Sequence, residues 1–186
     1  MTIRRTKRIK SKSSSKNKEV RRLEKENKAL CDQIVSLRDG GVCQVALTFP
    51  SAKTEHKGPL QADHFIPRSF KEAHFDTSNL TWVCGNCNFL KKLQRNGVGH
   101  MIDEIVLARE GQETFDRLKR IERSHVPFKG WRQIWFFEEV NTKLREELAG
   151  MKESRGMIES ADAVIADENS GERKSEPMTS TTRRAG

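Results

Sequence analysis

Two neighbouring segments decide the fold, Gln61-Ala-Asp-His-Phe-Ile-Pro-Arg68 and Asn79-Leu-Thr-Trp-Val-Cys-Gly-Asn-Cys-Asn88. The first predicts a short strand that its proline closes. The second predicts another strand, because Thr, Trp and Val favour extended backbone, followed by a Cys-x-x-Cys turn. A helix is expected over residues 88–94. The order strand, loop, strand, knuckle, helix predicts an α+β fold built on a ββα unit.

A metal knuckle is expected at the turn, because Cys84 and Cys87 have the spacing with which a tight turn offers two thiolates to one Zn²⁺. A tetrahedral site needs two further ligands, and Cys43 is the third. Its neighbours Gln, Val and Ala include no second cysteine, so the fourth ligand has two candidates. His56 lies in the loop nearer to the knuckle, whereas Cys31 flanks an apolar helix stripe and suits a packing role.

A second site, rich in oxygen ligands, is expected beside the knuckle. Asp63 offers a carboxylate and Asn88 an amide oxygen, a sparse set that leaves room for water and phosphate around Mg²⁺ or Mn²⁺. A neutral His64 can accept a proton from water near physiological pH. Adjacent strand residues point to opposite faces, so Asp63 and His64 share a site only where the strand twists or ends, which Pro67 favours. An Asp-His pair alone is typical of an exposed loop; together with Asn79 and Asn88 it predicts a small metal-dependent catalytic centre.

Basic residues surround this second site. They could contact phosphates, or they could form an ordinary solvated helix face. They are Arg68, Lys91, Lys92 and Arg95. The aromatic residues of the segment 131–137 are predicted to pack in a core rather than to stack on bases.

Composition points to one modest core with polar ends. Of 186 residues, 34% are hydrophobic and 33% are charged, and the net charge is +9. Residues 1–18 hold eight Lys or Arg and no acid, which fits attraction to phosphates or, alternatively, a solubilising or targeting tail. No apolar run approaches the roughly 20 residues of a membrane span. Four cysteines without a secretory signal predict a cytoplasmic protein that uses them for metal rather than disulfides.

The chain is expected to fall into five segments. Helix breaks are predicted at Gly111 and at residues 127–130. The segments are a disordered basic arm (1–18), an amphipathic helix (19–38), a metal-binding ββα core (39–98), a helical region (99–150) and a disordered tail (151–186).

The helix over residues 19–38 carries an apolar stripe interrupted by Asn27. The stripe follows spacings of three and four residues, and an Asn within such a stripe can fix the register of a parallel dimer. It lasts for fewer than three heptads. A homodimer and a helix that docks on its own domain are therefore the two alternatives.

These patterns resemble the HNH endonuclease superfamily, on Asp63-His64, Asn79 and Cys84-Gly-Asn-Cys-Asn88. More narrowly, the chain resembles the NinG/Rap recombination endonucleases of lambda-like phages, from Leu37-Arg-Asp-Gly-Gly-Val-Cys43 through the knuckle and on to the helix at 131–148. The likeness covers more than half of the chain. The family usually has a Cys-x-x-Cys where this chain has Cys43-Gln-Val-Ala46, and its cysteine-bearing N-terminal region has no counterpart here.

The resemblance implies roles for named residues. His64 would be the general base and Asn79 would brace the loop of the motif. Asp63 and Asn88 would bind the catalytic Mg²⁺ or Mn²⁺. The structural zinc would be held by Cys43, Cys84 and Cys87.

The function expected from this resemblance is metal-dependent hydrolysis of DNA, at branched recombination intermediates such as Holliday junctions. The compartment would be the cytoplasm of the host cell if the chain is phage-encoded. Two alternatives are a general HNH nicking endonuclease without branch preference and a non-catalytic zinc-knuckle protein that binds DNA.

Overall fold

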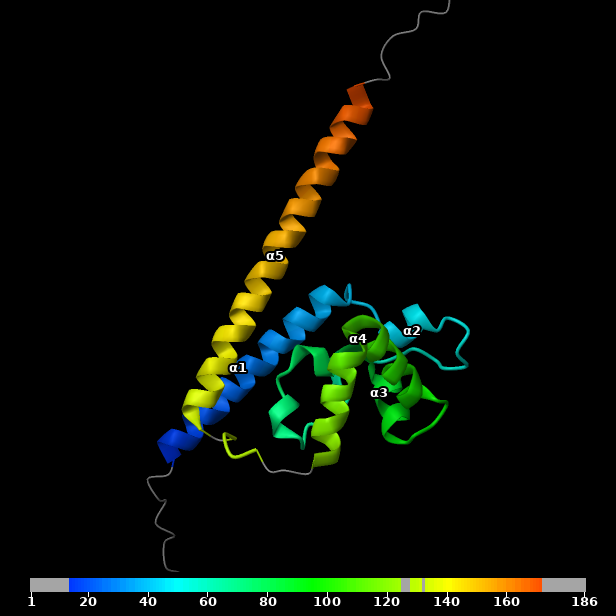
Figure 1. Cartoon of the computed structure of the whole chain (residues 1–186). Helices are drawn as coiled ribbons and strands as arrows, with labels where there is room; N and C mark the ends of the chain where they lie inside the picture. Colours follow the sequence, from blue (N-terminus) through cyan, green and yellow to red (C-terminus); the bar gives the residue numbers. More distant parts are fainter. Residues whose placement is uncertain (1–13, 125–127, 132, 172–186) are drawn as a thin grey trace, which may run out of the picture. The chain divides into compact units, whose positions relative to one another are not determined.

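The computed structural model describes residues 14–124, 128–131 and 133–171 (Figure 1). Its elements in chain order are α1 (Ser14–Arg38), α2 (Gln44–Thr48), β1 (Leu60–His64), the 3₁₀ turns η1 (Lys71–Ala73) and η2 (Thr77–Asn79), β2 (Leu80–Cys84), α3 (Gly85–Lys92), α4 (Val98–Ser124) and α5 (Ile134–Gly171). The described chain is α+β, with mostly helices and a small two-stranded sheet, which confirms the predicted class. The chain divides into two compact units, residues 1–149 and residues 150–186.

The sheet is an antiparallel hairpin of β1 and β2. Leu60 pairs with Cys84 at one end, and His64 pairs with Leu80 at the other. All β2 residues except Trp82 are buried, whereas β1 is more open to solvent. His64 is the last residue of β1, so it lies directly before the loop that joins the two strands.

The knuckle is itself the first turn of α3. The helix was predicted to begin at Asn88 but begins at Gly85. Cys84 has the extended backbone of an N-cap residue (φ −74°, ψ 160°), so the residues that follow it are already helical. Before the hairpin, the short helix α2 adds a helical element that the ββα pattern did not include.

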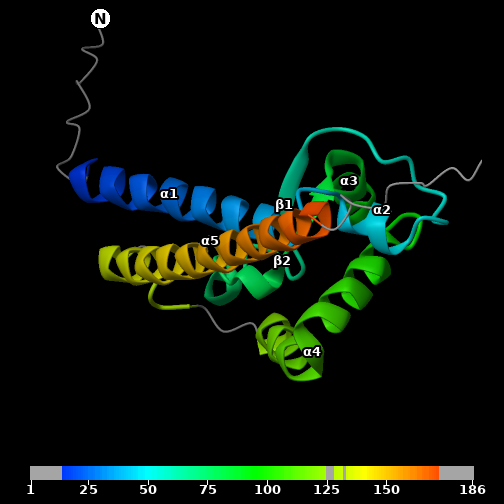
Figure 2. The same cartoon turned by 90° about the horizontal axis from the view of Figure 1, so that it is seen from above.

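The core lies between the hairpin and α4, which contacts both α2 and α3 (Figure 2). Its largest members from α4 are Ile102, Val106 and Leu118, all of them fully buried. Gly111 interrupts α4 with a non-helical backbone (φ 79°, ψ 168°), and the helix break was predicted at this residue. A positive φ is strained for any residue with a Cβ, so glycine suits the kink.

The stripe on α1 is buried within the chain. Val20, Leu23, Leu30 and Ile34 are all buried, and Asn27 is fully enclosed. The side chain of Asn27 donates to the carbonyl of Phe137 (2.9 Å) and accepts from the side chain of Asn141 (2.8 Å), both in the first half of α5. In the described chain the stripe is therefore that of a helix docked on its own domain, the second of the two alternatives.

Both terminal segments that were predicted to be disordered are helical in part. Five residues of the predicted basic arm belong to α1, and residues 1–13 lie outside the described part. The predicted disordered tail coincides with α5 as far as Gly171, where Met, Glu, Lys and Ala supply helix-forming residues, and residues 172–186 lie outside the described part. Among the helices described, none combines the length and the apolar character needed to span a membrane.

Candidate functional site

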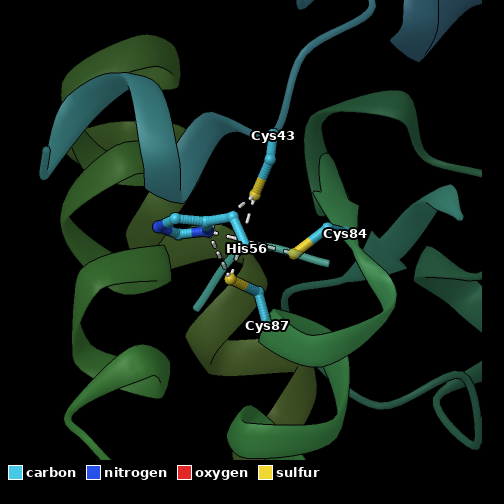
Figure 3. Close-up of side chains that lie close together, drawn as sticks. All are labelled: Cys43, His56, Cys84 and Cys87. Atoms are coloured by element: carbon cyan, nitrogen blue, oxygen red, sulfur yellow. Dashed lines mark hydrogen bonds between the residues drawn. The ribbon is translucent and has the colours of Figure 1, made fainter. Parts of the chain in front are cut away.

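Four metal-ligand side chains converge beside the end of β2 (Figure 3). Cys43 precedes α2, His56 lies in the loop before β1, and the knuckle supplies Cys84 and Cys87. Their four ligand atoms all lie within 4.8 Å of one another. All the cysteines are free thiols. His56, one of the two candidates for the fourth position, thus completes a Cys₃His cluster.

Four of the six donor–donor distances in this cluster are close to the edges of a tetrahedron. The sulfurs of Cys43 and Cys87 are 3.8 Å apart, and Nδ1 of His56 lies 3.3 to 3.9 Å from the three sulfurs. An ion about 2.3 Å from each sulfur and about 2.0 Å from nitrogen would separate two sulfurs by about 3.8 Å, and sulfur from nitrogen by about 3.5 Å. The four donors could therefore hold a metal ion such as zinc.

Asn86 fixes the loop that brings His56 to the cluster. Its backbone N–H donates to the carbonyl of Lys57 (3.0 Å), and its side-chain amide donates to the carbonyl of Glu55 (2.5 Å). These two carbonyls flank His56 in the chain. Asn86 was not among the predicted site residues, although an amide side chain in the middle of the Cys-x-x-Cys turn was visible in the sequence.

The knuckle sulfurs are in different electrostatic environments. Burial raises the pKa of the Cys87 thiol. Burial acts in the same direction on Cys84, but hydrogen bonds from the backbone N–H of Cys87 and from the neighbouring thiols outweigh it, so the pKa of Cys84 is lowered. Donors directed at Cys84 stabilise its thiolate, which is the form that binds a metal.

Cys31, the other candidate for the fourth position, lies outside the cluster. It is buried in α1, where its thiol donates to the carbonyl of Phe75 (3.8 Å). Burial raises its pKa to about 12. A thiol in such a site is a small packing group rather than a ligand, in keeping with its place on the flank of the stripe.

A second site lies where β1 ends against α3. A cavity of about 410 Å³ is lined by residues of both elements and of the loop after β1. Asp63 and His64 of β1 and Asn88 of α3 all line it, so the three predicted residues are brought together. Within a strand, the adjacent residues Asp63 and His64 would point to opposite faces. Because β1 ends at His64, both can line the same cavity.

The two residues that offer oxygen ligands in this cavity have different hydrogen-bond partners. Asp63 is buried, and its Oδ2 accepts from the ammonium of Lys91 at 2.6 Å. Lys91 also donates to the backbone carbonyl of His64. Oδ1 of Asn88 is buried and has no hydrogen-bond partner among the described residues. A buried acceptor without a donor is costly, which makes Asn88 Oδ1 a candidate ligand for a cation.

His64 is held in one tautomer. Its Nε2 lies 3.0 Å from the carbonyl oxygen of His74. A carbonyl can only accept, so Nε2 donates and the neutral ring keeps a lone pair on Nδ1. Burial lowers the pKa of His64 below its ordinary value, outweighing the hydrogen bond and the charge of Asp63, which raise it. The neutral, proton-accepting ring is therefore favoured near neutral pH.

Asn79 ties together the two ends of the loop between the strands. It is fully buried; its Oδ1 accepts from the backbone N–H of Ile66 (2.8 Å), and its Nδ2 donates to the carbonyl of Ala73 (2.9 Å). Its own carbonyl accepts from Phe65 (2.7 Å). Asn79 does not line the cavity, so its contribution is to hold the loop that follows His64.

The four predicted basic residues divide into two groups. Arg68, Lys91 and Lys92 line the cavity, whereas Arg95 is exposed beyond the end of α3 and is not part of the lining. Lys91 differs from the others because it is only 20% exposed and is paired with Asp63. Lys28 of α1 joins the lining as a further cation that the sequence did not suggest.

No protein-family model, no curated protein and no solved structure matches this chain. Its class therefore rests on its own geometry. That class is a small α+β protein in which a Cys₃His cluster could hold a metal such as zinc, beside a cavity lined by a carboxylate, an imidazole and an amide.

Proposed function

We propose that this chain is a metal-dependent DNA endonuclease of the HNH type. The observation that carries the proposal is the meeting of Asp63, His64 and Asn88 in one cavity, where Asn88 presents a buried oxygen without a partner. Hydrolysis of a phosphodiester requires an activated water, stabilisation of developing charge and help for the leaving oxygen. These three residues offer a base and two oxygen ligands suited to such chemistry.

Each residue then has a role. Nδ1 of His64 takes a proton from the attacking water, while the carbonyl of His74 holds the opposite side of the ring. Asp63 and Asn88 would hold Mg²⁺ or Mn²⁺, which when bound stabilises negative charge on the phosphate and on the leaving oxygen. In-line attack of the deprotonated water on phosphorus would break the bond to the 3′ oxygen, which takes a proton from solvent water, and would leave 5′-phosphate and 3′-hydroxyl ends.

The charge around the cavity supports DNA as the substrate. Arg68 and Lys92 are exposed at its lining and can contact phosphates on either side of the reacting one. We propose branched recombination intermediates, such as Holliday junctions, as the substrate class. This part rests on the resemblance to the NinG/Rap family, and a two-fold symmetric junction would favour a homodimer. A nicking endonuclease without branch preference is the alternative within the same chemistry.

The test is cleavage of a labelled four-way junction and of a matched linear duplex, with Mg²⁺, Mn²⁺ or EDTA. Loss of a general base typically costs about 10²- to 10⁴-fold in rate, so His64→Ala should lose cleavage on that scale. His100→Ala removes an exposed histidine on α4 and should cut like the wild type. Cutting that is equal on both substrates would replace branch specificity with general nicking. Cutting that survives His64→Ala unchanged would refute the catalytic assignment.

A second candidate function is a zinc-knuckle DNA-binding protein without catalysis. The Cys₃His cluster favours it, because that cluster could stabilise a DNA-binding domain by itself. It predicts equal DNA binding by the wild type and His64→Ala, and no cleavage with any divalent ion. The buried, unpartnered oxygen of Asn88 argues for the endonuclease, since a purely structural knuckle has no use for it.

A further inference from the structure

The ammonium of Lys91 occupies one of the two carboxylate oxygens with which Asp63 could bind a cation. Its Nζ is 2.6 Å from Asp63 Oδ2 and also contacts the carbonyl of His64. The two side chains are 20% and 11% exposed, so water screens their attraction only partly. Asp63 thus already has a counter-charge, supplied by the helix that also carries Asn88.

The charge of the cavity disfavours a second cation. Its lining holds four Lys or Arg residues and a single acid, Asp63. Lys28 has its own partner in Asp32 (2.5 Å), but Arg68 and Lys92 have no ion pair among the described residues. A divalent ion entering this cavity alone would be repelled by Arg68 and Lys92 and would compete with Lys91 for Asp63. A phosphate entering alone would be attracted.

We infer that Lys91 is a built-in counter-ion that closes the metal site of the DNA-free protein, so that the divalent ion and the DNA phosphate bind cooperatively. This rests on the proposed function, since it assigns the ion to Asp63 and Asn88. The phosphate offers the displaced Lys91 a new anionic partner and adds the negative charge that the cavity lacks. By reciprocity, DNA raises the affinity for the ion by the factor by which the ion raises the affinity for DNA. Lys91 in this sense weakens metal binding until the substrate is present.

The experiment measures Mn²⁺ binding by calorimetry to the full, zinc-loaded chain without DNA. Lys91→Met keeps the length of the side chain but removes the competing charge, and it should bind Mn²⁺ about tenfold more tightly than the wild type. Lys92→Met removes the same charge from the next residue, which has no contact with Asp63, and should change the affinity by less than about threefold. Lys91→Arg should stay as weak as the wild type. Asp63→Asn should abolish the site, which identifies the ion being measured.

The second measurement adds junction DNA in the His64→Ala background, where the DNA stays intact. DNA should tighten Mn²⁺ binding when Lys91 is present, by about tenfold, and should tighten it less in the Lys91→Met variant. Thermal unfolding of each variant confirms that it is folded.

Two outcomes would overturn the inference. One is equal Mn²⁺ affinity in the wild type and Lys91→Met; the other is equal tightening by Lys91→Met and Lys92→Met. These results are independent of cleavage. If Lys91→Met binds Mn²⁺ more tightly but no form of the protein cuts DNA, the counter-ion role stands and the endonuclease proposal fails. If the wild type cuts DNA and Lys91→Met gains no affinity, the endonuclease proposal stands alone.

Discussion

Cys87 and Asn88 are neighbours on α3, yet they belong to sites of opposite character. The Cys₃His cluster is a complete set of four donors at tetrahedral spacing, drawn from three separate segments. The cavity at Asp63 has a sparse set of oxygens, one of them taken by a lysine and another without a partner. Complete coordination suits an ion that holds the fold together, whereas incomplete coordination leaves room for a substrate. Changes in the Cys₃His cluster should therefore lower the stability of the fold, and changes in the cavity at Asp63 should lower the rate of cleavage.

The largest effect is expected from Cys87→Ser. It removes one of four metal ligands, and a structural zinc contributes about 10 kcal/mol or more to folding, as much as the whole stability of a typical domain. The variant should lose bound zinc in native mass spectrometry and most of its cooperative unfolding transition in circular dichroism. Cys31→Ala, which alters a thiol outside the cluster, should keep about one zinc per chain. Full zinc content in Cys87→Ser would show that the cluster does not hold the metal.

A smaller effect is expected from Asn79→Ala. The change leaves the buried N–H of Ile66 and the buried carbonyl of Ala73 without the partner they have now. The free energy of unfolding should fall by about 3 kcal/mol in urea denaturation, with zinc retained. Asn17→Ala, at an exposed position of α1, should stay within about 0.5 kcal/mol of the wild type. An equally small change in Asn79→Ala would mean that the loop is held by other contacts.

Asn86→Ala should weaken the cluster without touching the cavity. It loses the side-chain hydrogen bond to Glu55, so the loop carrying His56 is held less firmly. We expect a loss of about 1 kcal/mol, which is about fivefold in zinc affinity measured by competition with a chelator. Lys53→Ala, an exposed change in the same loop, should leave the affinity unaltered. Cleavage at saturating zinc should be the same in both, and a lower rate for Asn86→Ala would link the two sites.

The smallest effect concerns the thiol outside the cluster. Burial raises the pKa of Cys31 to about 12, so raising the pH from about 7 to about 9 should leave its thiolate population negligible. Mass spectrometry after treatment with iodoacetamide should find Cys31 unmodified in the folded protein at both pH values, and modified in denaturant. Rapid modification at pH 9 in the folded protein would contradict the burial of this thiol.

Much of this arrangement could be predicted from local sequence. The hairpin, the knuckle and the break at Gly111 follow from β-formers, a Cys-x-x-Cys turn and a glycine, all of which act over a few residues. His56 was one of two candidates because it lies in the loop nearer to the knuckle. The start of α3 was misplaced because a metal knuckle and a first helical turn share the same backbone.

The features of the fold and the site that could not be predicted depend on contacts between residues far apart in the sequence. The choice between His56 and Cys31 required the fold, because both lie at similar separations from Cys43 and only one loop reaches the knuckle. The pairing of Lys91 with Asp63 joins residues 28 positions apart, and from the sequence Lys91 resembled its neighbour Lys92. The burial of Asn27 against α5 likewise joins residues more than 100 positions apart, so a local stripe could not distinguish docking from dimerisation.

The adjacency of Cys87 and Asn88 makes this stretch of α3 intolerant of insertions. Successive residues of an α-helix are rotated by about 100° about its axis, and one residue fits one ligand cluster while the next lines the cavity. One extra residue between them would rotate Asn88 and the rest of α3 by that angle. The oxygen of Asn88 and the ammonium of Lys91 would then both turn away from Asp63. The distance along the chain between these two residues is therefore fixed by helical geometry.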